Sequence, residues 1–170
     1  MKNNLVLIGM MGCGKTTVAK QLEKLLPEYN RIDIDEEIEK SSGKKISEIF
    51  LKFGEPHFRL LESNKIKSVL LKKNQIIALG GGAFENAENR AVICSNAKVI
   101  YLKTSAEEIY KRIKNEFHRP LLSKNVSAER ILEIMNKREP NYLKADIIVQ
   151  TDNKTPEEIS KEILEVIENA

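Results

Sequence analysis

Residues 9–17 read Gly-Met-Met-Gly-Cys-Gly-Lys-Thr-Thr, which is the full spacing of a phosphate-binding loop. An apolar run at residues 5–8 precedes the loop and a helical pattern follows it, as such a loop requires. Glycine lets the backbone turn where a side chain would block it, and the backbone N–H groups can then face phosphate oxygens. The alternative is a plain glycine turn between a strand and a helix. We expect these positions to bind nucleotide phosphates: Gly12, Cys13, Gly14, Lys15, Thr16 and Thr17.

Lys15 and Thr16 carry the chemistry of this loop. The lysine can reach the β- and γ-phosphates, and the threonine hydroxyl can ligate Mg²⁺. The helix that follows adds the partial positive charge of its N-terminus. The loop therefore predicts a site for a nucleoside triphosphate with Mg²⁺.

A pair of carboxylates, Asp33 and Asp35, stands at the end of a second apolar run, residues 31–34. Alternation along a strand would put both carboxylates on one face, with Ile34 pointing into the core. The carboxyl ends of parallel strands form the ligand crevice of an open α/β sheet, so we expect the pair to face the phosphate loop. One carboxylate there could hold Mg²⁺ and the other could accept a proton from an attacking hydroxyl. The alternative is that Asp35 caps the following helix.

Three consecutive glycines, Gly80, Gly81 and Gly82, follow the apolar run at residues 75–79. A simple turn needs only one or two glycines, so the triplet suggests that a ligand approaches the backbone closely. This run also lacks the acidic residue that many phosphate-loop enzymes use to organise Mg²⁺. That task would then fall to Asp33.

Three arginines stand in positions suited to an anionic substrate. Arg59 lies three residues before Glu62 in a helical pattern, so Glu62 can orient its guanidinium. Arg119 lies in an irregular stretch, and Arg138 lies near the end of the next helical pattern. A guanidinium matches a carboxylate with two parallel hydrogen bonds, which a lysine cannot do. Each arginine alone would be an ordinary surface charge; the neighbouring motifs make them candidates for binding.

The elements that must position these residues alternate between strand and helix, which predicts a parallel sheet covered on both faces. Capping signals at Ser105, Ser127 and Thr155 mark the starts of three helices. Two stretches break the alternation: residues 35–73 are mostly helical, and residues 115–126 have no clear period. In a phosphoryl-transfer enzyme these would be a substrate-binding insertion at about 35–73 and a mobile lid at about 113–126. The predicted strands are residues 5–8, 31–34, 75–79, 98–102 and 146–150.

Size and charge narrow the class of protein. The 170 residues are most simply one domain. A net charge of +3, with no basic block of five or six residues, argues against nucleic-acid or membrane-surface partners. Cys13 and Cys94 lie far apart without metal-ligand spacing, which indicates reduced thiols. With no signal peptide and no apolar stretch of membrane-spanning length, we expect a cytoplasmic protein. No exposed apolar stripe stands out, so we expect a monomer.

Together these motifs resemble the shikimate kinase family over nearly the whole chain. The resemblance implies a three-layer P-loop fold of the nucleoside-monophosphate-kinase type, with five parallel strands in the order 2-3-1-4-5. It also implies transfer of the γ-phosphate of ATP to the 3-hydroxyl of shikimate, giving shikimate 3-phosphate and ADP on the route to chorismate and aromatic amino acids. The segments that carry it are residues 9–16, Asp33-Ile34-Asp35, Phe58-Arg59-Leu60-Leu61-Glu62, Gly80-Gly81-Gly82, Arg119-Pro120-Leu121-Leu122 and Arg138-Glu139-Pro140-Asn141-Tyr142.

The resemblance also implies roles for the substrate-side residues. Asp35 would bind the shikimate hydroxyls and act as the base. Arg59 and Arg138 would clasp the shikimate carboxylate, with the glycine triplet approaching the ring hydroxyls. Thr16 and Asp33 would hold Mg²⁺, Asp33 through water.

On the nucleotide side, the resemblance implies that Arg119 stabilises charge on the transferred phosphoryl group. Arg112 matches the position that packs against adenine. Lys154 stands where some relatives carry arginine, and a lysine stacks on a purine less well than a planar guanidinium. The implied ligands are therefore ATP or ADP, Mg²⁺ and shikimate.

Three alternative functions share part of this pattern. A related small-molecule kinase, such as gluconate kinase or a nucleoside monophosphate kinase, would use the same fold, but the acid pair, glycine triplet and Phe58-Arg59 favour shikimate. A GTP-dependent switch is rejected, because Asn136-Lys137-Arg138-Glu139 lacks the aspartate of a guanine-binding motif and lies in a helical pattern. An ATP-binding module without turnover is disfavoured by the retained lysine, acids and arginine.

Overall fold

The computed structural model describes residues 3–114 and 127–169. One parallel sheet of five strands, in the order β2-β3-β1-β4-β5, forms its centre. This order confirms the one that the family resemblance implied. Side chains of the central strand alternate between two cores, because successive residues of a strand point to opposite faces. The strands are β1 (Asn4–Ile8), β2 (Asn30–Asp33), β3 (Gln75–Ala78), β4 (Ala97–Lys103) and β5 (Ile147–Gln150).

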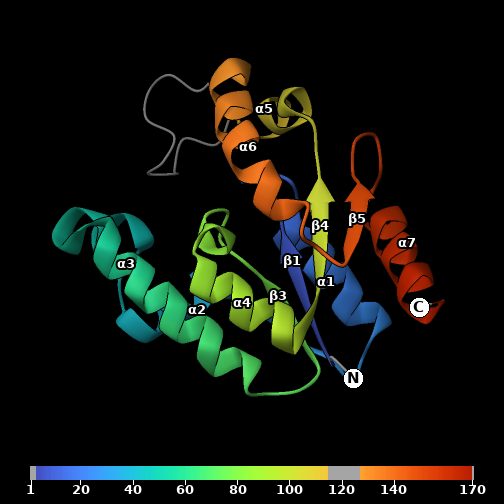
Figure 1. Cartoon of the computed structure of the whole chain (residues 1–170), viewed down its shortest axis with the longest axis horizontal. Helices are drawn as coiled ribbons and strands as arrows, with labels where there is room; N and C mark the ends of the chain where they lie inside the picture. Colours follow the sequence, from blue (N-terminus) through green and yellow to red (C-terminus); the bar gives the residue numbers. More distant parts are fainter. Residues whose placement is uncertain (1–2, 115–126, 170) are drawn as a thin grey trace.

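Helices cover both faces of the sheet (Figure 1). The first and last helices pack together over one face, and the remaining helices bury their apolar residues on the other face or beyond the strand ends. Figure 1 shows α5 and α6 above the carboxyl ends of the strands. The helices are α1 (Lys15–Leu25), α2 (Ile34–Ser42), α3 (Ile46–Leu70), the short 3₁₀ helix η1 (Ala83–Glu85), α4 (Ala87–Asn96), α5 (Ala106–Ile113), α6 (Ala128–Tyr142) and α7 (Pro156–Glu168).

The three predicted helix starts are confirmed. The hydroxyl of Ser105 accepts a hydrogen bond from the Glu108 N–H at the start of α5, and Ser127 does the same at the start of α6. Thr155 caps α7 with a complete capping box: its hydroxyl accepts a hydrogen bond from the Glu158 N–H, and the Glu158 carboxylate accepts one from the Thr155 backbone N–H. Each cap contributes about 1 kcal/mol by satisfying an N–H that the helix leaves without an internal partner.

The helical segment that follows β2 consists of α2 and α3. Gly43 ends α2 with a left-handed φ of 65°, which an L-residue adopts only at a cost. Gly54, with φ of 79°, divides α3 into two parts that meet at a kink.

Of the predicted lid at about 113–126, only Ile113 and Lys114 fall within the described residues, at the end of α5. Among the described residues, no helix is long and apolar enough to cross a membrane.

The predicted end of the second strand is wrong. The strand stops at Asp33, and Ile34 is already the first residue of α2. Asp33, rather than Asp35, is the N-cap: its Oδ1 accepts hydrogen bonds from the N–H groups of Asp35 at 3.0 Å and Glu36 at 3.3 Å. A capping aspartate starts a helix more favourably than the strand can continue, so strand alternation does not explain how the two carboxylates are placed.

Candidate functional site

A cavity of about 1070 Å³ lies at the carboxyl ends of the strands. Segments far apart in the sequence line it: the phosphate loop after β1, the start of α2, the middle of α3 and the glycine triplet after β3. Every predicted site residue within the described part of the chain lines this cavity; Arg119 lies outside that part. Those residues are Gly12, Cys13, Gly14, Lys15, Thr16, Thr17, Asp33, Asp35, Arg59, Gly80, Gly81, Gly82, Arg112, Arg138 and Lys154.

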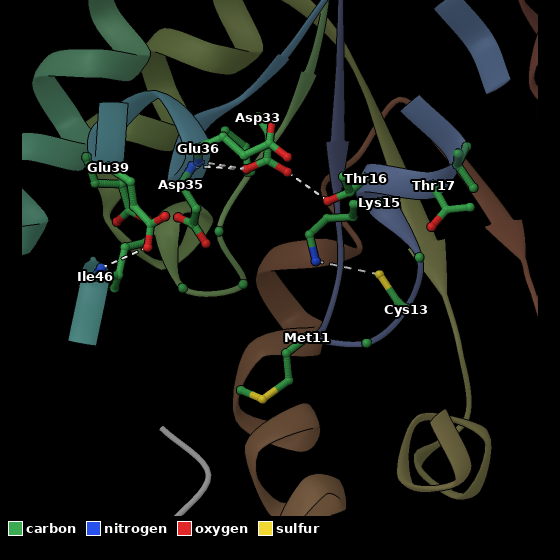
Figure 2. A pocket seen from close by; sticks show the side chains of 18 of the residues that line it. Met11, Cys13, Lys15, Thr16, Thr17, Asp33, Asp35, Glu36, Glu39 and Ile46 are labelled. Carbon is green, nitrogen blue, oxygen red and sulfur yellow. Dashed lines mark hydrogen bonds between the residues drawn. The ribbon is translucent and has the colours of Figure 1, made fainter. Parts of the chain in front are cut away.

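The phosphate loop curves between β1 and α1. Gly14, with φ of 98°, provides the left-handed turn into the helix. The Lys15 ammonium lies inside the curve of the loop, where it donates to the carbonyls of Gly9 at 3.0 Å and Met10 at 2.8 Å. It also lies 3.7 Å from the sulfur of Cys13 (Figure 2). The loop therefore holds a fixed positive charge beside the N-terminus of α1, the arrangement that attracts a phosphate.

Asp33 joins the phosphate loop to the start of α2. Its Oδ2 accepts a hydrogen bond of 2.7 Å from the Thr16 hydroxyl, while its Oδ1 caps the helix (Figure 2). A hydroxyl and a carboxylate side by side are oxygen donors of the kind that Mg²⁺ prefers. The described residues contain no group of three acidic, histidine or cysteine side chains that could hold a metal ion alone. The pair thus fits a Mg²⁺ that takes its other ligands from phosphate and water.

Arg59 of α3 is held on three sides. Its Nη1 lies 2.8 Å from Oε2 of Glu62, and its Nη2 lies 3.0 Å from Oε1 of Glu55. On the third side the guanidinium packs on the Gly82 backbone: a Cβ at that position would lie 2.8 Å from Nη2. Glu62 is only 1% exposed, and this burial raises the pKa of its carboxyl, although the nearby Arg59 opposes the rise. The buried carboxylate fixes the direction of the guanidinium.

The rest of the glycine triplet is crowded by charged side chains as well. A Cβ on Gly80 would lie 2.8 Å from Oε1 of Glu62 and 3.1 Å from Oδ1 of Asp35. The carbonyl of Gly81 accepts a hydrogen bond of 3.0 Å from Nη1 of Arg138. The protein's own carboxylates and guanidinium groups therefore already require the absence of side chains here.

Two further cationic side chains, Arg112 and Lys154, line the cavity. Arg112 of α5 pairs with Glu108 at 3.0 Å and donates to the Cys13 carbonyl at 3.3 Å, so it lies directly against the phosphate loop. Lys154, in the loop between β5 and α7, forms an ion pair with Glu162. Both side chains keep a face toward the cavity.

One side of the cavity is an apolar wall that was not predicted from the sequence. Ile46, Phe50 and Phe58, all from α3, line the cavity, and the rings of Phe50 and Phe58 pack with centroids 4.8 Å apart. The spacing of Ile46 and Phe50 places them on one helix face, but that pattern also fits an ordinary core contact. Only the kink at Gly54 brings Phe58 beside them.

Comparisons with known proteins agree with the motifs. Residues 11–168 match the family model described as shikimate kinase. The chain is 44% identical over 165 residues to a shikimate kinase of Thermodesulfovibrio yellowstonii, covering 97% of this chain and 95% of the relative. It is 43% identical over 161 residues to that of Persephonella marina, covering 95% and 96% of the two chains.

Solved structures lead to the same family. The structure of shikimate kinase from Acinetobacter baumannii in complex with shikimate matches with a TM-score of 0.93 and 33% identity, covering 98% of this chain and 93% of that one. Shikimate kinase from Aquifex aeolicus matches with a TM-score of 0.85 and 36% identity, covering 98% and 96%. On the family match, the near full-length relatives and the shared fold, this chain belongs to the shikimate kinase family.

Proposed function

We propose that this chain transfers the γ-phosphate of ATP to the 3-hydroxyl of shikimate, giving shikimate 3-phosphate and ADP on the route to chorismate and aromatic amino acids. Family membership supports the reaction. We assign the reaction to these residues because one cavity contains the phosphate loop, the carboxylate of Asp35 and the guanidinium groups of Arg59 and Arg138. Such a set can bind a triphosphate and an anionic alcohol side by side.

The nucleotide would be held by the phosphate loop. Its N–H groups and the Lys15 ammonium would contact the phosphates, and Arg112 would stack against the adenine. Lys154 would contribute a weaker contact there. Thr16 and Asp33 would hold Mg²⁺, which neutralises phosphate charge when bound. Arg119 is assigned to the transferred phosphoryl group by its sequence motif alone.

Shikimate would bind between α3, the glycine triplet and α6. Arg59 and Arg138 would bind its carboxylate, since a guanidinium offers two parallel donors to a planar anion. The apolar face of the ring would rest on Ile46, Phe50 and Phe58 of the wall described above. This division puts the charged groups on one edge of the substrate and its hydroxyls near Asp35.

Asp35 would bind the reacting hydroxyl and accept its proton. Figure 2 shows its carboxylate directed into the space that the phosphate loop also faces. A loose phosphoryl-transfer transition state asks mainly for positioning and charge neutralisation, so the base need not be strong. The chain's main tasks are then to align the hydroxyl and to stabilise charge with Lys15.

We also propose a cytoplasmic location and a monomeric state. In the described part of the chain no disulfide joins Cys13 and Cys94, which agrees with a reducing compartment. Sedimentation at several protein concentrations would check the oligomeric state.

The test of function is a coupled ADP-release assay with ATP and Mg²⁺, comparing shikimate, gluconate, AMP and no acceptor. We expect acceptor-dependent release with shikimate alone. Faster release with gluconate or AMP would mean that Arg59 and Arg138 bind a substrate other than shikimate. No acceptor-dependent release would support an ATP-binding module instead. As a control, Arg59→Ala should raise the KM for shikimate and leave the KM for ATP unchanged.

A further inference from the structure

Beside the cavity lies a polar side chain that the proposed chemistry does not use. Tyr142, the last residue of α6, is only 1% exposed. Its hydroxyl donates a hydrogen bond of 2.5 Å to the carbonyl of Gly81. Burial raises the pKa of the Tyr142 phenol, so it stays protonated and remains a donor at physiological pH.

The same carbonyl accepts from a second residue of α6. Nη1 of Arg138 lies 3.0 Å from the Gly81 oxygen. Residues four apart share one face of a helix, which lets Arg138 and Tyr142 converge on one atom. A carbonyl oxygen has two lone pairs, so these two donors use both of its positions for accepting a hydrogen bond. The position of the guanidinium is therefore linked to the position of the Gly81 peptide.

Gly81 and Tyr142 are both tightly packed. A Cβ on Gly81 would lie 3.3 Å from Nη1 of Arg138 and 3.4 Å from the backbone nitrogen of Met11 in the phosphate loop. The ring of Tyr142 packs against Tyr101 of β4, with centroids 5.1 Å apart and an interplanar angle of 38°. Tyr101 of β4, an inner strand of the sheet, thus holds the phenol, and the phenol holds the middle glycine of the triplet.

We propose that Tyr142 is a positioning residue for shikimate binding, because its hydroxyl fixes the Gly81 peptide and that peptide fixes the Arg138 guanidinium. The inference rests on the proposed function, which assigns Arg138 to the substrate carboxylate. Two parallel hydrogen bonds to a carboxylate form in only one orientation of the guanidinium. With the phenol absent, the Gly81 carbonyl keeps a single donor, and the peptide can turn with Arg138 attached to it.

Tyr142→Phe tests this role, because it removes one oxygen atom and keeps the ring. We expect the KM for shikimate to rise about fivefold, the range for loss of one buried hydrogen bond. The kcat and the KM for ATP should stay within about twofold, because the lost contact acts equally in the ground and transition states. Tyr101→Phe is the matched control: it removes a hydroxyl from the neighbouring buried ring and should leave the KM for shikimate unchanged.

A double-mutant cycle with Arg138→Lys separates positioning from packing. If Tyr142 acts through Arg138, Tyr142→Phe should have little further effect on the KM for shikimate in the Arg138→Lys background. The same fold-change in both backgrounds, or an unchanged KM together with a lower melting temperature, would overturn the inference. Calorimetric titration of shikimate into each variant gives the same comparison without turnover. A wild-type chain that shows no shikimate-dependent ADP release would instead refute the proposed function.

Discussion

Gly82→Ala should weaken shikimate binding without unfolding the protein. The backbone at Gly82 has φ of −103° and ψ of −8°, which alanine adopts without strain. The added methyl group would lie 2.8 Å from Nη2 of Arg59, about 0.6 Å closer than the 3.4 Å at which ordinary contact begins. The guanidinium must therefore retreat, and its bond of 2.8 Å to Glu62 must lengthen or turn.

The size of the effect follows from that displacement. Misplacing a binding group by 1 Å can cost about a hundredfold, so a shift of about 0.6 Å should cost roughly tenfold in kcat/KM, or about 1.4 kcal/mol. The loss should fall on the KM for shikimate, because the proposed contact of Arg59 with the carboxylate would be made equally in the ground and transition states. The atoms that move are the far end of a flexible side chain, so the melting temperature should change by less than about 3 °C.

The assay is steady-state ADP release with shikimate and ATP varied in turn, on four proteins: wild type, Gly82→Ala, Arg59→Ala and the double variant. If the methyl group acts through the guanidinium, Gly82→Ala should add almost nothing once Arg59 is absent. An equal fold-change in both backgrounds, or an equal rise in the KM for ATP, would refute the reasoning. An unchanged KM for shikimate would show that the guanidinium has room to move.

Three further predictions use the same assay or equilibrium unfolding. Asp35→Asn should lower kcat by about 10²–10⁴-fold with little change in the KM for ATP, and a smaller fall would remove the base role. Arg112→Ala should raise the KM for ATP about threefold and leave that for shikimate unchanged, whereas equal changes would contradict an adenine contact. Glu62 has a folded-state pKa above its ordinary 4.5, so its contribution to stability should fall as the pH rises above that value. Measured by urea unfolding between pH 4 and 7, the free energy of unfolding of the wild type should fall relative to that of Glu62→Gln, which cannot ionise, and parallel pH profiles would contradict the raised pKa.

The sequence was sufficient to predict the strands of the sheet and the starts of α5, α6 and α7. Continuous apolar runs such as residues 75–79 are typical of strands buried on both faces, and Ser127 and Thr155 carry capping chemistry that does not depend on tertiary structure. The end of β2 was predicted wrongly, because Ile34 is as apolar as a strand residue and only the cap made by Asp33 shows that the helix has begun.

The charged residues of the site were predictable by type, but only those of their partners that lie on the same helix were predictable as well. The spacing of Arg59 and Glu62 predicted their contact, since it is local to one helix. The packing of Arg59 on Gly82 and the convergence of Arg138 and Tyr142 on Gly81 join segments far apart in the chain. No local pattern contains such contacts, and the apolar wall depends on a kink whose angle the sequence does not specify.

The two oxygens of Asp33 have a consequence for engineering this enzyme. One oxygen faces the Thr16 hydroxyl and the other holds the first turn of α2, on which Asp35 stands. A rigid carboxylate cannot move one oxygen and keep the other still. If Thr16 and Asp33 hold Mg²⁺ as proposed, an ion of larger radius, or a glutamate in place of Asp33, would tilt the turn that carries Asp35. Metal preference and the position of Asp35 are therefore not independent design variables in this protein, and variants selected for one should be screened for the other.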